Sequence, residues 1–262
     1  MPTTYAHYTF GQEVLKLIDE DINKIINKNK DLFNIGLHGP DILFYYKPLK
    51  SNRISKVGHN LHERIAADFF GNAKDVINAS SDYEASLSYI FGFICHFVLD
   101  SHCHPYIIKN EGRIITHSHI ETEFDRVLML KDNLNPVLFR PTSHIKCDCE
   151  YSEVISSFYK EISKGEIKDA LKSMKQCLNF LVAPGRVKRN LLMLGLKISG
   201  NYENMVGLLM SYSPIEECNE MNEKLYEIYN ESTNLAAEMV DYYYRNLKAD
   251  GKLDQRFNRN FL

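Results

Sequence analysis

The sequence predicts an all-α protein, a multi-helix bundle with a metal centre between helices of its N-terminal half. Apolar residues recur at steps of three and four along most of the 262 residues, and no segment shows the alternation of a strand. Nine of the ten histidines lie between residues 7 and 119, and only His144 lies beyond them. We therefore expect a single domain over residues 1–262, with its site in about 4–130 and a helical scaffold in about 150–248.

Composition places the chain among ordinary globular proteins. Hydrophobic residues make up 44% and charged residues 25% of the sequence, and the formal net charge is −3. Such a charge gives no reason to expect a stable nucleic-acid partner. No apolar run approaches the roughly 18–20 residues of a transmembrane segment. The first residues lack the basic and apolar pattern of a secretory signal, so we expect a cytoplasmic protein whose six cysteines are mostly buried thiols.

The periodicity predicts helices in the N-terminal half, separated by one turn. Amphipathic spacing favours one helix over 10–30 and another over 58–70. The Gly-Pro pair in GLHGPDILFYYKP indicates a turn or loop between them. An almost wholly apolar helix over 79–103, begun by a Ser or Asp cap, belongs at the centre of the domain.

Further helices are expected in the second half of the chain. A helix over 116–132 precedes a loop over 133–150 that holds two prolines and the tripeptide Cys-Asp-Cys. Beyond that loop the pattern predicts helices over 152–163, 166–183, 185–199 and 214–247.

The central helix carries the first candidate metal ligands. His96 and Asp100 are four residues apart, so both project from one face of the helix and can share a cation. His104 continues the stripe where the helix should meet Pro105. His102 is an alternative to His104. An isolated buried His–Asp pair is usually a structural hydrogen bond and not a metal site. This pair is not isolated.

The next helix repeats the pattern twice. His117 with Glu121 and His119 with Glu123 are both four residues apart. Ile120, Phe124, Val127 and Leu128 define the apolar face of the helix, and His117 and Glu121 lie slightly closer to that face. We prefer this first pair by a small margin.

The donor types favour zinc over iron or manganese. Paired His and carboxylate residues on facing helices are a common way to hold metals in a bundle. Di-iron bundles use Glu-x-x-His pairs with an excess of carboxylates, whereas imidazole dominates here. The adjacent His-Asp of HD-type phosphohydrolases and the HExxH of zinc proteases are both missing from the sequence.

Earlier segments supply three more candidates. His7 precedes the first expected helix, Asp41 lies in the Gly-Pro turn, and His62 opens the second helix, with His59 and His38 as spares. Eight potential ligands from five segments exceed what one ion needs, and they predict a centre of two or three metals. His144 with Cys147 and Cys149 is a weaker candidate, because two cysteines separated by one residue are a poor signal.

This combination resembles the zinc-dependent phospholipase C family, which is related to the zinc-dependent single-strand nucleases. The resemblance covers roughly residues 4–130, through YAHYTFG, GPDILFYY, GHNLH, HFVLDSHCHPY and HSHIETEFD. It implies one zinc on Asp41, His62, His96 and Asp100, and a second zinc on His104, His117 and Glu121. A third would take His7, with Asp100 bridging to the first.

The sequence departs from that family at the third site. In secreted members a mature N-terminal Trp completes this site, but the present sequence has no Trp. The spacing between the bridging Asp and the next His is also shorter here, which keeps His102 open as a substitute for His104. We therefore expect two or three zinc ions.

The implied chemistry is hydrolysis of a phosphodiester by a metal-activated hydroxide, with Asp41 and Asp100 as the catalytic candidates. The expected partner is a phosphoester small molecule or a phospholipid headgroup. Nothing in the sequence resembles the separate lipid-binding domain that some members of that family carry. The alternatives are a non-catalytic zinc-binding or regulatory protein of the same fold, or a zinc nuclease.

Overall fold

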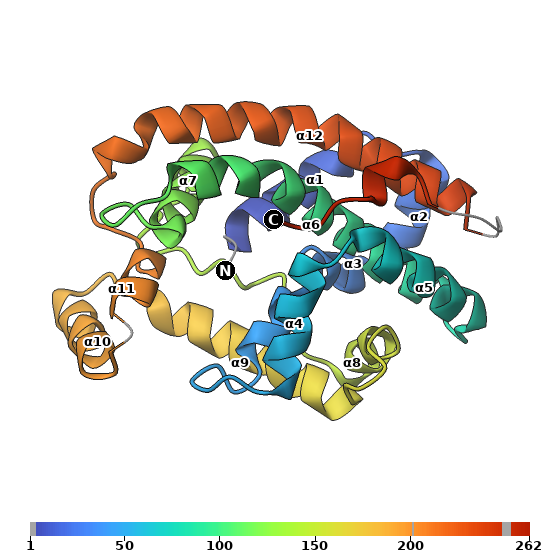
Figure 1. The fold of residues 1–262 in the computed structure, drawn as a ribbon, viewed down its shortest axis with the longest axis horizontal. Coiled ribbons are helices and arrows are strands. Elements are labelled where there is room, and N and C mark those ends of the chain that lie inside the picture. The colour runs from blue at the N-terminus through green and yellow to red at the C-terminus, as the bar shows by residue number, and fades with distance from the viewer. Residues whose placement is uncertain (1–3, 201, 248–252) are drawn as a thin grey trace.

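The computed structural model describes residues 4–200, 202–247 and 253–262, and its regular elements are all helical within those ranges. The all-α prediction is therefore confirmed. Figure 1 shows α12 (Asn219–Arg245) running along one long side of the molecule, with α9 (Lys164–Leu181) on the opposite side and α6 (Tyr83–Asn110) between them. Among the described helices, none is both long and apolar enough to cross a bilayer.

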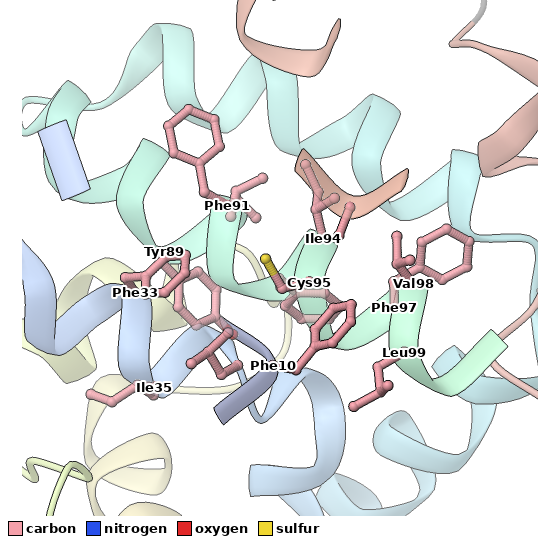
Figure 2. Packing of buried hydrophobic residues seen from close by; sticks show 14 of the residues in the cluster. Phe10, Phe33, Ile35, Tyr89, Phe91, Ile94, Cys95, Phe97, Val98 and Leu99 are labelled. Carbon is pink, nitrogen blue, oxygen red and sulfur yellow. The ribbon is translucent and has the colours of Figure 1, made fainter. Parts of the chain in front are cut away.

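The central helix α6 is buried all round, as its composition predicts. Every residue from Ala85 to Ser101 is buried, and Asp82 caps the first turn by accepting from Ala85 N at 3.1 Å. Figure 2 shows α6 side chains such as Phe91, Cys95 and Phe97 pointing to different sides of the helix. A single apolar cluster packs around them and extends from Tyr5 to Phe261.

The prediction that α6 ends at Pro105 is wrong. The helix continues through Pro105 to Asn110. Proline lacks the N–H that would bond the carbonyl of Ser101, four residues earlier. Arg259 donates to that carbonyl instead, with Nη2 2.5 Å from the oxygen, so a distant side chain compensates the lost bond.

The single helix expected over 10–30 is also wrong, because three helices occupy this region. They are α1 (Thr4–Val14), α2 (Glu20–Lys28) and α3 (Lys30–Gly36). Asp19, Glu20 and Asp21 favour a new helix start, where carboxylates interact well with the helix dipole. The Asn23 amide donates to Leu15 O at 3.1 Å and satisfies a carbonyl at the end of α1. His7 consequently lies inside α1, not before it.

The helix expected over 58–70 is likewise two helices, α4 (Arg53–Glu63) and α5 (Ala66–Ala79). A capping box between Asn52 and Ser55 starts α4 earlier than predicted. The first N–H of α5, from Ala66, donates to Arg259 O at 2.8 Å. The expected turn before α4 contains a 3-10 helix, η1 (Gly39–Tyr45).

Among the remaining elements, the predicted helices appear in the expected order with shifted ends, whereas the pattern does not predict the short elements after residue 200 as separate helices. The remaining elements are α7 (His117–Lys131), α8 (Cys149–Ser156), α10 (Arg186–Ile198), α11 (Tyr202–Met205), η2 (Val206–Leu208), η3 (Glu216–Cys218) and η4 (Gln255–Phe257). The helix α8 ends seven residues before the predicted Ser163. Ser156 and Ser157 there bond back to backbone carbonyls, and such local bonds compete with helix continuation.

Candidate metal centre

Asp100 lies at the middle of the site and its two oxygens face different histidines. On α6, His96 Nε2 is 3.1 Å from Asp100 Oδ2, one turn away. His104 Nε2, one turn in the other direction, is 3.7 Å from Oδ1. The carboxylate thus faces a different imidazole on each side, as a bridging ligand does.

His62 of α4 and Asp41 of η1 also lie close to Asp100. His62 Nε2 lies 3.1 Å from Asp41 Oδ1 and 3.8 Å from Asp100 Oδ2. Asp41 is held by η1, where Gly39 has a positive φ of 45°. A Cβ on Gly39 would lie 2.2 Å from His96 Cδ2, so only glycine lets this turn approach the imidazole.

His7 approaches from α1. Its Nε2 lies 3.1 Å from Asp100 Oδ1, and its ring stacks on His96 with centroids 4.4 Å apart. The start of α1 is fixed by Asp125 of α7, which accepts from Tyr5 N and Ala6 N at 3.2 and 2.7 Å. This contact between two helices sets the position of His7.

The N-terminal half of α7 supplies a further group of donors. His117 Nε2 is 3.2 Å from Glu121 Oε1, and His104 Nε2 is 3.5 Å from the same oxygen. All eight predicted ligands are therefore brought together. Their donor atoms form three close groups, each within 4.8 Å: His7, His96 and Asp100; Asp41, His62 and His96; and His104, His117 and Glu121.

Four of these histidines are oriented through their other ring nitrogen. In each, Nδ1 lies close to an oxygen acceptor, so Nε2 is left with its lone pair toward the cluster. The acceptors are Gly58 O for His62 (2.8 Å), Leu37 O for His96 (3.3 Å), Phe261 O for His104 (2.7 Å) and Glu111 Oε2 for His117 (3.0 Å). This outer arrangement is typical of metal-binding imidazoles.

Several buried polar atoms in the cluster fit a cation. Asp41 Oδ1 and Oδ2, His96 Nε2, Asp100 Oδ2 and Glu121 Oε2 have no hydrogen-bond partner in the described part of the chain. His96 and Asp100 are thus close without hydrogen-bond alignment, and unsatisfied buried groups are costly. A cavity of about 20 Å³ also lies between His7, Asp100, His104 and Glu121. Imidazole and carboxylate donors in this mixture suit zinc.

Neighbouring charges shift the pKa values of the carboxyl groups in the cluster. Burial raises the pKa of Asp100, but the nearby imidazoles of His96, His104 and His7 hold it well below its usual range. Burial similarly opposes ionisation of Glu121, yet surrounding positive groups that include His104 and His117 lower its pKa to about 2. Both carboxyl groups are therefore anionic at neutral pH.

The pKa values of the histidines shift in different directions, depending on whether burial or the neighbouring carboxylates dominate. For His104, burial lowers the pKa, while Asp100 and Glu121 outweigh it and raise the pKa to about 9. For His62, burial is also opposed by Asp41, and the pKa is raised. His96 is fully buried, and there the desolvation outweighs Asp100, so its pKa is lowered.

His102, the alternative to His104, is engaged elsewhere. Its Nδ1 donates to Val98 O at 2.8 Å, and its Nε2 accepts from Arg259 Nη1 at 3.2 Å. Arg259 is the residue that caps the Ser101 carbonyl freed by Pro105. His102 thus supports the continuation of α6, and no close donor group among the described residues includes it.

The alternative pair on α7 also has other partners. His119 Nδ1 receives the Thr116 backbone N–H at 3.2 Å, which completes a capping box at the start of α7. Glu123 pairs with Arg126 at 2.9 Å and accepts from Ile215 N at 3.1 Å. These two side chains hold α7 in place.

The spare histidines and the cysteine motif lie outside the three groups. His59 is exposed and packs on Phe44, with ring centroids 4.5 Å apart. His38 and His144 form a buried pair with their Nε2 atoms 2.7 Å apart. Cys147 and Cys149 belong to none of the donor groups found among the described residues.

Sequence reasoning missed the residues that orient the ligands. Phe261, Gly58 and Leu37 contribute backbone carbonyls, which have no signature in a sequence. Phe261 also donates its N–H to His62 O at 3.1 Å, so a segment expected outside the site braces two of its histidines. Glu111 could have been found as a carboxylate six residues before His117.

Comparison with known proteins agrees with this geometry. A family model described as zinc dependent phospholipase C matches residues 6–174. No curated protein and no solved structure matches the chain. The matched region contains all eight candidate ligands and ends before α10 and α12.

Proposed function

Because the chain belongs to the zinc dependent phospholipase C family, we propose that it is a multi-zinc phosphoesterase that hydrolyses a phosphodiester. The observation that carries this proposal is the position of Asp100. Its two oxygens face imidazoles from α1, α4 and α6 at 3.1–3.8 Å, in a buried site with unsatisfied donor and acceptor atoms.

The proposed ligand sets follow the three donor groups. Asp41, His62 and His96 would hold one zinc together with Asp100, and His104, His117 and Glu121 would hold a second. His7 with Asp100 would contribute to a third. The separate orientation of the two Asp100 oxygens supports its role as the bridging residue.

Zinc ions bound there would act as Lewis acids, lowering the pKa of a water toward ~7 and neutralising charge on phosphoryl oxygens. The protein's own residues would orient the water, accept its proton and exclude bulk solvent. Asp41 has both oxygens buried beside His62, so it can orient the attacking water and accept its proton. Burial of Asp41, His96 and Asp100 excludes bulk water and strengthens these interactions.

We propose that the substrate enters from the side of His117, because that imidazole is the most exposed member of the three groups, with 26% of its side chain accessible. The side chains of the other seven candidate ligands are all below one tenth exposed. A phosphoester headgroup that presents only its phosphoryl oxygens to the centre fits this arrangement. A phospholipid and a soluble phosphodiester both offer such a group.

Hydrolysis of bis(p-nitrophenyl) phosphate and p-nitrophenyl phosphorylcholine by the zinc-loaded chain tests the proposal. We expect turnover that a chelator abolishes and added zinc restores. Asp100→Asn should lower turnover by more than about 100-fold, because even outer-shell changes cost 10–100-fold. Asp68→Asn, at an exposed carboxylate of α5, is the matched control and should leave turnover unchanged.

If the chain retains zinc but hydrolyses neither ester in a chelator-sensitive manner, the enzymatic proposal is wrong. The chain would then be a zinc-binding protein of the same family fold without turnover. Unchanged activity of Asp100→Asn would show that the metal assignment is wrong.

A further inference from the structure

The helix α10 is unlike the other long helices because none of its residues is buried. It lies beyond the region matched by the family model, at one edge of the molecule beside α11 (Figure 1). Four large apolar side chains on α10 are exposed: Val187 (77%), Leu191 (64%), Leu194 (54%) and Ile198 (80%). Such a concentration of exposed apolar residues is unusual on a surface helix.

These four residues form one continuous stripe. At about 100° per residue, positions 187, 191, 194 and 198 fall within roughly 60° of one another around the helix. The opposite side, with Arg189, Met193 and Leu196, is half-buried. Arg189 fixes this inner side by donating to Met210 O at 2.6 Å and lying over the Tyr212 ring. The stripe therefore points away from the protein.

Basic residues flank the stripe on both sides. Arg186 and Lys197 are exposed on one flank of the helix, whereas Lys188 on the other flank is half-buried and donates to Val182 O at 2.7 Å. Between residues 170 and 202 the sequence has six Lys or Arg residues and no Asp or Glu. The rest of the chain holds 25 basic residues (31 less these six) against 34 acidic ones, so positive charge is concentrated on this segment.

A series of contacts connects α10 to the metal centre. Arg189 holds Met210, and the neighbouring Ser211 and Ile215 bond to Glu123 of α7. Gly207 packs so closely on Ser118 that a Cβ there would lie 2.9 Å from the serine Cβ. The segment that carries α10 is thus attached to the same turns of α7 that hold His117 and Glu121.

From this arrangement we propose that α10 is an interfacial helix that docks the protein on an anionic phospholipid surface. An apolar stripe with basic flanks is the pattern by which amphipathic helices lie in a headgroup region. The inference rests on the proposed function for one element, the phosphoester substrate, and what it adds is the helix that would bring the metal centre to a lipid surface. Docking itself is independent of turnover.

Co-sedimentation of the zinc-loaded full chain with vesicles tests the docking. We expect binding to vesicles of equal amounts of phosphatidylglycerol and phosphatidylcholine, and little binding to pure phosphatidylcholine. The double variant Leu191→Glu with Leu194→Glu should lose this binding at least tenfold. A double control, Ile65→Glu with Leu130→Glu, places the same changes at other exposed apolar residues and should bind like the unchanged chain.

Charge is tested separately with Arg186→Gln and Lys197→Gln together. Each basic residue near an anionic surface contributes on the order of 1 kcal/mol, so the pair should weaken binding roughly tenfold or more. All variants should hydrolyse bis(p-nitrophenyl) phosphate at the unchanged rate. That readout separates the two proposals: a failed docking leaves soluble turnover intact, whereas a failed enzyme hydrolyses no ester however well it binds vesicles.

Two results would overturn the docking. One is equal sedimentation of the Leu191→Glu/Leu194→Glu variant and the unchanged chain, or no sedimentation of either. The other is a dimer in sedimentation-velocity runs without lipid that the same variant converts to a monomer. The stripe would then be covered by a second copy of the chain.

Discussion

At the scale of single residues, the site depends on which nitrogen of each histidine is engaged. His104 and His102 are two residues apart on α6, yet their side chains have different roles. His104 directs Nε2 toward Asp100 and Glu121, while His102 uses both nitrogens, one for Val98 and one for Arg259. The two rings are chemically identical, and only their partners distinguish them.

We predict that His104→Ala and His102→Ala separate these roles. His104→Ala removes a donor shared with Glu121 and should weaken zinc retention by more than about 100-fold. His102→Ala removes two hydrogen bonds and should cost about 1–2 kcal/mol of stability with zinc content unchanged. Zinc analysis after gel filtration and chemical unfolding of both variants measure these effects. Loss of zinc from His102→Ala alone would reverse the assignment.

At the scale of elements, the close crossing of α3 and α6 positions His96. Gly36 and Gly92 meet where the two helices cross, and a Cβ on Gly92 would lie 2.2 Å from Phe33 O. This contact brings Leu37, at the end of α3, close enough for its carbonyl to orient His96. The packing of the core thus sets the direction of the His96 ring, a candidate ligand.

Gly92→Ala should therefore destabilise the protein, although alanine is the better helix former. The added methyl group meets a backbone oxygen that cannot move freely, and overpacking of this kind costs about 1–3 kcal/mol. Gly71→Ala in α5 is the matched control, because a Cβ there meets nothing within 4 Å. It should be neutral or stabilising by up to ~1 kcal/mol. Urea unfolding of both variants tests the contrast, and equal effects would contradict it.

The C-terminal segment acts as an element of the site. Arg259 supports α6 at Pro105, and Phe261 bonds to both His62 O and His104 Nδ1. Removing residues 259–262 should weaken zinc retention 10–100-fold, because orienting partners of metal ligands contribute about this much. Removing only Leu262 should have little effect, because within the described part of the chain its N–H bonds to Asn260 and not to a candidate ligand histidine. Competition with a zinc chelator measures both truncations, and equal retention would refute the role of the segment.

These contacts show what the sequence could and could not predict. Spacing of four residues on a helix is local, so His96 with Asp100 and His117 with Glu121 could be found as pairs. The choice between His104 and His102 depends on Arg259 and Phe261, more than 150 residues away along the chain. The continuation of α6 past Pro105 depends on the same distant arginine. Neither contact leaves a periodic pattern, and backbone carbonyls leave no pattern at all.

At the scale of the whole molecule, a buried pair of histidines outside the metal centre couples the free energy of unfolding to pH. His38 and His144 join η1 to the loop before α8, with Nε2 atoms 2.7 Å apart. Burial lowers the pKa of His38 well below its ordinary value and lowers that of His144 to about 3. Both are therefore neutral in the folded protein, whereas in the unfolded chain they titrate near 6.5.

Stability should fall as the pH drops through the unfolded value. Above about pH 6.5 the buried pair makes its full contribution to the free energy of unfolding. Between about pH 6.5 and about pH 3 the unfolded state binds protons that the folded state excludes, so this contribution is lost. From pH 7 to pH 5 the chelator-treated chain should lose about 2 kcal/mol more of its unfolding free energy than a His144→Gln variant loses. Urea titrations at the two pH values measure this difference. Identical losses in both proteins would rule out the pair as the cause.

In the proposed centre, eight side chains from α1, η1, α4, α6 and α7 hold more than one zinc ion around Asp100. The most direct test of this arrangement is the zinc content of the purified chain, determined by mass spectrometry of the metal against protein concentration. The arrangement predicts two or three tightly held zinc ions per chain, and fewer in Asp100→Asn. A saturated content below two zinc ions per chain would contradict a multi-metal centre.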